Sequence, residues 1–182
     1  MKATGIVRRI DDLGRVVIPK EIRRTLRIKE GDPLEIFTDR EGEVILKKYS
    51  QGGELGKFAR EFAESLAQTS GHAVCITDRD QIVAAAGGLK KDYVGKSISG
   101  VLEEMINERE SILAGKTPER HVELTNDDEK PEVQQVITPI LCGGDAIGSV
   151  ILSGKDRSVK MGETENALAK CAAGFMGRQM EQ

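Results

Sequence analysis

The chain has 182 residues and a net charge of −3, with 38% apolar and 31% charged residues, a balance typical of folded soluble domains rather than disordered chains. Its longest nearly unbroken apolar stretch, residues 82–89, is far shorter than the roughly 20 residues that a membrane-spanning helix needs. Too few residues precede Arg8 and Arg9 to form the apolar core of a secretory signal, which takes about 7 to 15 residues. We therefore expect a cytoplasmic protein of one ordinary domain or two small ones.

Cysteine, histidine and aromatic residues are too sparse for several kinds of site. Cys75, Cys142 and Cys171 are far apart, which argues against a disulfide framework or a zinc site, and we expect all three to be reduced and buried. His72 and His121 each stand alone, so we expect surface or strand histidines and no metal. With no Trp, two Tyr and four Phe, a base-stacking surface for single strands is not expected.

Positive charge is concentrated at the N-terminal end. Residues 1–50 contain twelve Lys or Arg against nine Asp or Glu, whereas the remainder has 15 against 21. The excess is steepest in residues 1–29, where nine basic residues face three acidic ones. Because a polar, glycine-rich junction follows at residues 50–53, we place a linker at 51–54, between domains of residues 1–50 and 55–182.

The first fifty residues predict two β-hairpins separated by a short helix. The strands are expected at residues 5–10, 16–18, 34–37 and 43–47. Asp and Gly occupy the turns between them, and Pro19 favours the start of a helix that ends before Gly31. Apolar residues are adjacent in these strands, as in Val16 and Val17, which indicates that both sheet faces need cover. So short a chain cannot supply that cover by itself, and we infer an intertwined homodimer.

Four uncommon strings occur in this part of the chain. They are KATGIVRR at 2–9, LGRVVIP at 13–19, EIRRTL at 21–26 and ILKKY at 45–49. Together they cover nearly all of residues 1–50, and in this order they resemble the AbrB family of transition-state regulators. The resemblance implies a swapped-hairpin fold, in which two protomers interleave their hairpins into one DNA-binding β-barrel.

The same resemblance implies which side chains contact DNA. The arginines that match the family's DNA-contacting set are Arg8, Arg15, Arg23 and Arg24. Candidates for further phosphate contacts are Lys2, Arg9, Lys20 and Arg27. Arginine suits both phosphate oxygens and the acceptor edge of guanine, because it combines a permanent charge with a planar fork of donors. A dimer would present eight arginines of the matching set, although a charge run can also simply solvate a surface.

The remainder of the chain predicts an antiparallel sheet with helices on its faces. Apolar residues recur every three or four positions at 55–67, 101–109 and 167–180, as in amphipathic helices. The strands are expected at residues 73–77, 82–86, 121–124, 133–140 and 146–152. Turn residues at 78–80 and 142–145 join neighbouring strands into hairpins. An α+β domain follows.

This order of elements, with Pro139 and Ile140 followed by DAIGSVI at 145–151, resembles a GAF domain. Joined to the AbrB-like head and the closing strings AAGF and RQMEQ, it makes the whole chain similar to AbrB-family sporulation regulators. The resemblance implies a transcription factor of spore-forming bacteria that acts on the nucleoid of the forming spore. It also implies tetramers joined through the terminal helices, and an unidentified small effector whose loop we expect near residues 115–132.

Two other functions fit the sequence less well. Some GAF-like proteins reduce free methionine sulfoxide with cysteines, but Cys75 lies inside an apolar string, whereas a reactive thiol needs exposure and a cationic neighbour. Swapped-hairpin heads also occur in antitoxins, but here a long periodic segment stands in place of a disordered toxin-binding tail. Since we find no phosphate loop or nucleophile elbow, we expect a homo-oligomeric regulator of double-stranded DNA, without enzymatic activity or a cofactor.

Overall fold

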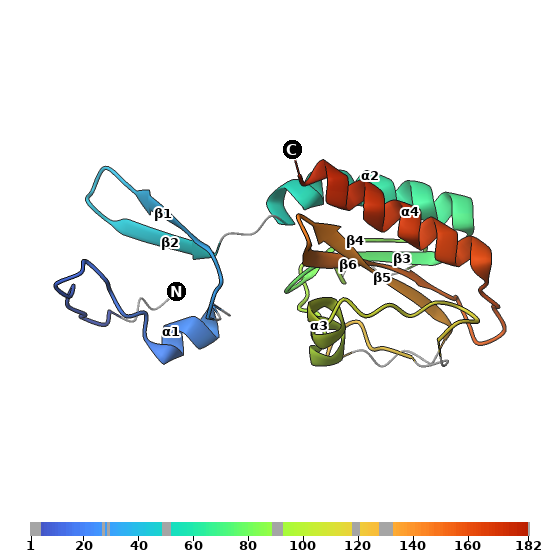
Figure 1. Ribbon diagram of the computed structural model, residues 1–182, viewed down its shortest axis with the longest axis horizontal. Helices are drawn as coiled ribbons and strands as arrows, with labels where there is room; N and C mark the ends of the chain where they lie inside the picture. The colour runs from blue at the N-terminus through green and yellow to red at the C-terminus, as the bar shows by residue number, and fades with distance from the viewer. Residues whose placement is uncertain are drawn as a thin grey trace. The chain divides into compact units, whose positions relative to one another are not determined.

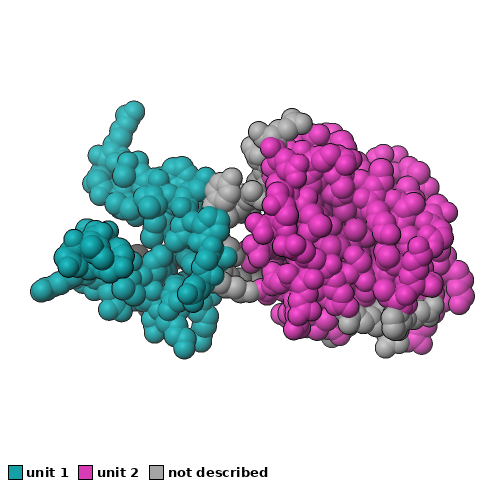
Figure 2. All heavy atoms as spheres, in the orientation of Figure 1, with its two compact units in different colours: residues 1–50 teal, residues 51–182 magenta. Residues whose placement is uncertain are grey.

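The computed structural model describes residues 5–26, 28, 30–48, 52–88, 93–117, 121–127 and 133–181 of the chain. It divides into two compact units, unit 1 with residues 1–50 and unit 2 with residues 51–182 (Figure 2). No helix in the described ranges combines the length and the apolar character that crossing a membrane would require.

The described residues of unit 1 form a short helix and a β-hairpin. Helix α1 (Lys20–Thr25) follows Pro19, and its acidic first turn and basic last turn complement the helix dipole. Strands β1 (Leu34–Thr38) and β2 (Val44–Lys48) pair in an antiparallel manner, with Phe37 opposite Ile45. The predicted helix and the predicted second hairpin are therefore confirmed.

The first predicted hairpin is formed only at its turn. The backbone N–H of Asp11 donates to the carbonyl oxygen of Arg15 at 3.0 Å, and the N–H of Gly14 donates to that of Asp11 at 3.0 Å. Residues 5–10 and 16–18 form no strands, so the predicted strands are wrong for the single chain. A strand needs a neighbour to accept and donate its backbone hydrogen bonds, and within the described part of unit 1 these segments have none. The part of the single chain that the structure describes consequently forms no closed barrel.

Unit 2 is built on a four-stranded antiparallel sheet. Its strands are β3 (Ala73–Asp78), β4 (Ile82–Ala86), β5 (Gln135–Cys142) and β6 (Asp145–Ser153). They lie in the order β4-β3-β6-β5, so two hairpins join through the central β3 and β6. Four of the five strands predicted for this part are confirmed, with small shifts at their ends.

The fifth predicted strand, at residues 121–124, is wrong. In place of a neighbouring strand, the side-chain amide of Gln135 donates to the carbonyl oxygen of Val122 at 2.9 Å and accepts its N–H at 2.8 Å. The buried amide of Asn166 bonds both backbone groups of Ala114 in the same way, at 2.8 and 3.0 Å. Two side-chain amides thus fasten the described parts of the long connection before β5, together with a single backbone bridge between Ile112 and Ile137.

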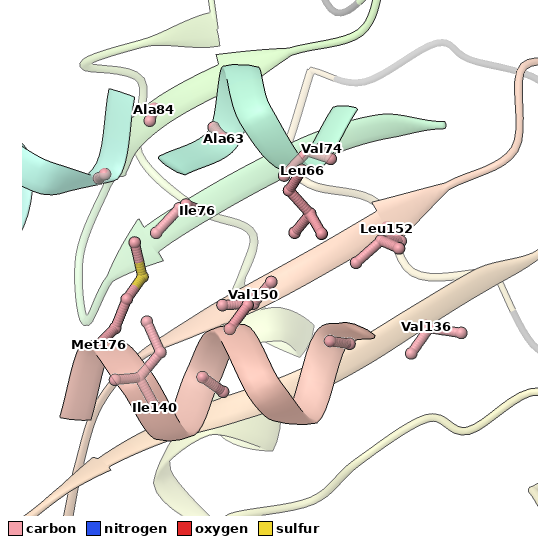
Figure 3. Packing of buried hydrophobic residues seen from close by; sticks show 14 of the residues in the cluster. Ala63, Leu66, Val74, Ile76, Ala84, Val136, Ile140, Val150, Leu152 and Met176 are labelled. Carbon is pink, nitrogen blue, oxygen red and sulfur yellow. The ribbon is translucent and has the colours of Figure 1, made fainter. Parts of the chain in front are cut away.

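Helices cover both faces of the sheet, which confirms the α+β class. Helices α2 (Gly52–Ser70) and α4 (Glu163–Gln179) lie side by side on one face, and α3 (Gly100–Asn107) lies on the other (Figure 1). Beneath α2 and α4, Leu66, Ile76 and Met176 belong to one apolar cluster (Figure 3). A second cluster, which includes Leu102 and Ile137, lies on the side of α3. The strands are apolar on both faces because each face has its own core.

Helix α2 begins earlier than expected. The sequence predicts a linker at residues 51–54, whereas residues 52–54 belong to the helix. The first turn of a helix tolerates glycine, since its N–H groups need no partner within the helix and glycine is accepted at the N-cap. The described part of the glycine-rich junction, Gly52 and Gly53, is therefore helical.

Candidate nucleic-acid interface

The basic side chains that the sequence singled out are exposed in unit 1. Those described are Arg8, Arg9, Arg15, Lys20, Arg23 and Arg24, all of them exposed. Lys2 and Arg27 lie outside the described residues. Arg8 and Arg15 flank the first turn, while Arg23 and Arg24 belong to α1. Residues 1–29 contain only three acidic residues to neutralise these positive charges, so this part of the chain can attract a polyanion.

One of these arginines is held by a carboxylate. Nε of Arg15 donates to Oδ2 of Asp11 at 2.9 Å, and Oδ1 of Asp11 accepts the backbone N–H groups of Leu13 at 3.0 Å and Arg15 at 2.7 Å. The hydrogen bonds from Arg15 are the main cause that lowers the pKa of Asp11, so the carboxylate stays ionised. Sequence reasoning missed Asp11 as a site residue, although an aspartate four residues before a candidate arginine was a usable signal.

Unit 1 has almost no apolar core of its own. Pro19 is the one residue in the described part of the unit that is buried. Its large exposed apolar side chains are Ile6, Val7, Ile10, Leu13, Val16, Val17, Leu26, Ile36, Phe37, Val44, Ile45 and Leu46. So many exposed large apolar side chains in one small unit indicate surface that a partner covers.

Two of the three cysteines of unit 2, Cys75 and Cys142, do not have the surroundings of reactive thiols. Cys75 is fully buried, as expected, whereas Cys142 is half-buried and Cys171 exposed, so the prediction of three buried cysteines is wrong. Burial, together with the charges of Glu181 and Asp145, raises the pKa of Cys142. A raised pKa leaves little of the thiolate that cysteine catalysis needs.

The histidines likewise differ from expectation. His72 is buried, and its Nε2 lies 3.3 Å from Oε1 of Glu165 at the start of α4. His121 is half-buried in a connection rather than in a strand. In the ranges that the structure covers, no three His, Cys, Asp or Glu residues gather as metal ligands would.

Comparison with known proteins identifies relatives of both units. Residues 54–181 match the family described as "Stage V sporulation protein T C-terminal, transcription factor", and residues 7–54 match "Antidote-toxin recognition MazE, bacterial antitoxin". Stage V sporulation protein T of Bacillus subtilis (strain 168) is 56% identical over 182 residues, which is 100% of both chains.

The two parts also have separate relatives. The transition state regulatory protein AbrB of the same organism is 67% identical over 49 residues, which are 27% of this chain and 50% of that protein. The GAF domain of an Acinetobacter phosphoenolpyruvate-protein phosphotransferase superposes with a TM-score of 0.55 at 11% identity, over 69% of this chain and 81% of that one. At this identity the likeness shows the GAF fold alone. From the match over its whole length, the chain belongs to the stage V sporulation protein T family of transcription factors.

Proposed function

We propose that this protein regulates sporulation genes by binding double-stranded DNA as an intertwined homodimer. Residues 1–50 form the DNA-binding head, and the GAF-like domain occupies the rest of the chain, with the forming spore as its place of action. Arg8, Arg15, Arg23 and Arg24 of both protomers lie against adjoining grooves of the duplex. The observation that carries the proposal is the combination, in unit 1, of exposed arginines with an apolar surface that the single chain leaves uncovered.

The exposed apolar side chains of unit 1 support the proposal that two copies of the chain form the head together. Among the residues that the structure describes, 5–10 and 16–18 have no strand partner, and their apolar side chains, such as Val7 at 93% exposure, face solvent. Interleaving with the same segments of a second protomer would supply both the missing ladders and the missing core. Such a dimer fixes the distance between its two arginine sets, so its target sites have approximate twofold symmetry.

The arginines make two kinds of contact with DNA. Contacts to phosphates supply affinity and fix the register, whereas contacts to base edges supply sequence preference. Arg9 and Lys20, both exposed, are candidates for additional phosphate contacts. We expect limited preference for sequence, because most of the candidate contacts are to phosphates, which carry no sequence information directly.

Unit 2 assembles the dimers and responds to a small molecule. Phe62 of α2 stacks on Phe175 of α4 with ring centroids 5.3 Å apart, and both Phe58 and Phe175 are partly exposed. This aromatic surface on the terminal helices suits contact with a second unit 2, which would give a tetramer. An effector that binds one arrangement of the tetramer better than another would change DNA affinity.

A second candidate function, an antitoxin, is favoured by the match of residues 7–54 to the MazE family. That match ends where unit 2 begins, and unit 2 is a folded domain rather than a disordered tail. Recovery of a small toxin in stoichiometric amount with the native protein would support the antitoxin and count against the regulator.

The test of the proposal is a gel shift with duplex DNA. Arg15→Ala and Arg23→Ala in the full chain should weaken binding at least tenfold, a loss of about 1.4 kcal/mol or more. Arg60→Ala is the matched control, because Arg60 is an exposed arginine of unit 2 whose ion pair with Glu64 lies on the surface. Circular dichroism and oligomer size should be the same for all variants. Retention of full binding by Arg15→Ala and Arg23→Ala would refute the assignment.

A further inference from the structure

The two turns of unit 1 have the same structure. Residues 11–15 and 39–43 both read Asp-x-x-Gly-x. In each, Oδ1 of the aspartate accepts the N–H groups of the third and fifth residues, at 3.0 and 2.7 Å in the first turn and 2.9 and 2.9 Å in the second. In each, the aspartate N–H also donates to the carbonyl of the fifth residue. Gly14 and Gly42 take positive φ angles of 75° and 84°, which glycine adopts without strain.

The turns differ in their fifth residue. It is Arg15 in the first turn and Glu43 in the second. Oδ2 of Asp11 accepts Nε of Arg15 at 2.9 Å, whereas among described residues Oδ2 of Asp39 has no such partner. Because the second turn forms without a contact at Oδ2, that contact is not needed to make the turn. Its effect is on Arg15.

The contact fixes one edge of the guanidinium group. Oδ1 anchors Asp11 to the turn backbone through two hydrogen bonds, and Oδ2 holds Nε of Arg15. The described residues offer no acceptor to Nη1 and Nη2, and the arginine side chain is 69% exposed. An ion pair this exposed adds little stability. Its consequence is a fork of donors that is held in one orientation and is open at its outer edge.

We propose that Asp11 is a positioning residue for Arg15, and that it makes Arg15 the side chain that reads guanine. With Nε held by Asp11, the two Nη groups meet O6 and N7 of guanine end-on in the major groove. Preorganisation lowers the entropy lost when the fork binds two acceptors. The carboxylate also repels phosphates, so Asp11 lowers the affinity for DNA that lacks the guanine. This inference rests on the proposed function, because it requires the head to bind duplex DNA.

The chain supplies a matched pair of variants, Asp11→Asn and Asp39→Asn. Asparagine keeps Oδ1, so both turns retain their backbone hydrogen bonds. Its Nδ2 is a donor and cannot accept Nε of Arg15, so only Asp11→Asn releases the arginine. Both substitutions remove one negative charge from the same unit, which makes Asp39→Asn the control for charge.

The experiment measures the affinity of the full chain for two duplexes. One is the duplex that the wild-type protein selects from a random pool, and the other is a scrambled duplex of the same composition. For Asp11→Asn we expect a specificity ratio at least tenfold lower, with weaker binding to the selected duplex and equal or stronger binding to the scrambled one. Asp39→Asn should leave the ratio within twofold of wild type. A purely structural role for Asp11 would weaken binding to both duplexes alike and would overturn the proposal.

A double-mutant cycle shows whether Asp11 acts through Arg15. Lysine keeps the charge of Arg15 but has no fork, so Arg15→Lys should lower the specificity ratio, and adding Asp11→Asn should then change it less than twofold. An equal effect of Asp11→Asn in both backgrounds would overturn the inference. If the wild-type protein binds neither duplex, the proposed function fails. If it binds selectively and Asp11→Asn leaves the ratio unchanged, the positioning role alone fails.

Discussion

Gly177 allows helix α4 to pack closely against strand β5. It is buried in α4, and a Cβ placed there would lie 2.0 Å from the backbone carbonyl oxygen of Leu141 in β5. Gly174, three residues earlier on the same helix, has nothing within 4 Å of the corresponding position. Gly177→Ala and Gly174→Ala are therefore the same substitution in the same helix with opposite expected effects.

The structure sets the expected magnitudes. A Cβ almost never approaches another atom within 3.0 Å, so Gly177→Ala must separate α4 from β5 by about 1 Å. Overpacking of this kind lowers the unfolding free energy by about 1–3 kcal/mol. A clash with a backbone carbonyl should cost about 3 kcal/mol or more, because the carbonyl cannot rotate away as a side chain can. Alanine gains about 1 kcal/mol of helix propensity at either position. We expect Gly177→Ala to lose roughly 2 kcal/mol of unfolding free energy and Gly174→Ala to gain about 1 kcal/mol.

The assay is urea unfolding of the full-length protein followed by far-ultraviolet circular dichroism, at one fixed protein concentration because oligomers gain stability with concentration. The difference between the two variants should be about 3 kcal/mol. If Gly177→Ala proved as stable as Gly174→Ala, the close approach of α4 to Leu141 would be refuted, and with it the packing of the terminal helix.

Two further predictions concern unit 2 and use the same assay. Burial raises the pKa of Asp78, so the native state favours the neutral form and loses stability as the pH rises from below the ordinary value through the raised one. Asp78→Asn keeps an acceptor but does not titrate. Its stability relative to wild type should increase from pH 4 towards neutrality, and a difference independent of pH would count against this origin. Arg109 follows the end of α3 with a φ of 58°, so Arg109→Gly should add about 0.5–1 kcal/mol. Glu108 has a φ of −83°, so Glu108→Gly should lower the unfolding free energy by a similar amount. A change of the same sign in both variants would contradict the role of the positive φ at Arg109.

Sequence patterns predicted most of unit 2, because its helices repeat apolar residues every three or four positions and its strands are short, almost continuously buried apolar runs bounded by turn residues. The exception is informative: Val122 and Leu124 are both buried at 2% exposure and alternate with polar residues, as in a strand. An extended segment held by the amide of Gln135 shows the same alternation. The pattern reports which side chains are buried and not what bonds the backbone, so the two cases cannot be separated from sequence.

Individual environments were harder to predict than elements. Cys171 belongs to the apolar repeat of the last helix but faces outward, whereas Ala172 and Met176 of the same repeat are buried. His72 is buried because β3 begins beside the start of α4, where Glu165 lies. Both outcomes depend on how elements far apart in the chain pack, which spacing does not reveal.

For the candidate site, the sequence indicated the arginines but not the residue that orients one of them. The motif resemblance singled out Arg15, and its exposure fits a role in binding. Asp11 appeared only as part of a turn. Its second role became visible once the two turns could be compared atom by atom, since Oδ1 makes the same bonds in both and Oδ2 does not.

The salt dependence of DNA binding by the full chain tests the central claim most directly, which is that two copies of the head lie on one duplex. With eight phosphate contacts the slope of log Kobs against log salt approaches roughly −7, and with Arg15 on bases in both copies it is roughly −5. Arg8→Ala, Arg23→Ala and Arg24→Ala should each make the slope shallower by about 1.8, because each removes one contact from each of two protomers. A slope that stays at the wild-type value in all three variants would contradict the account.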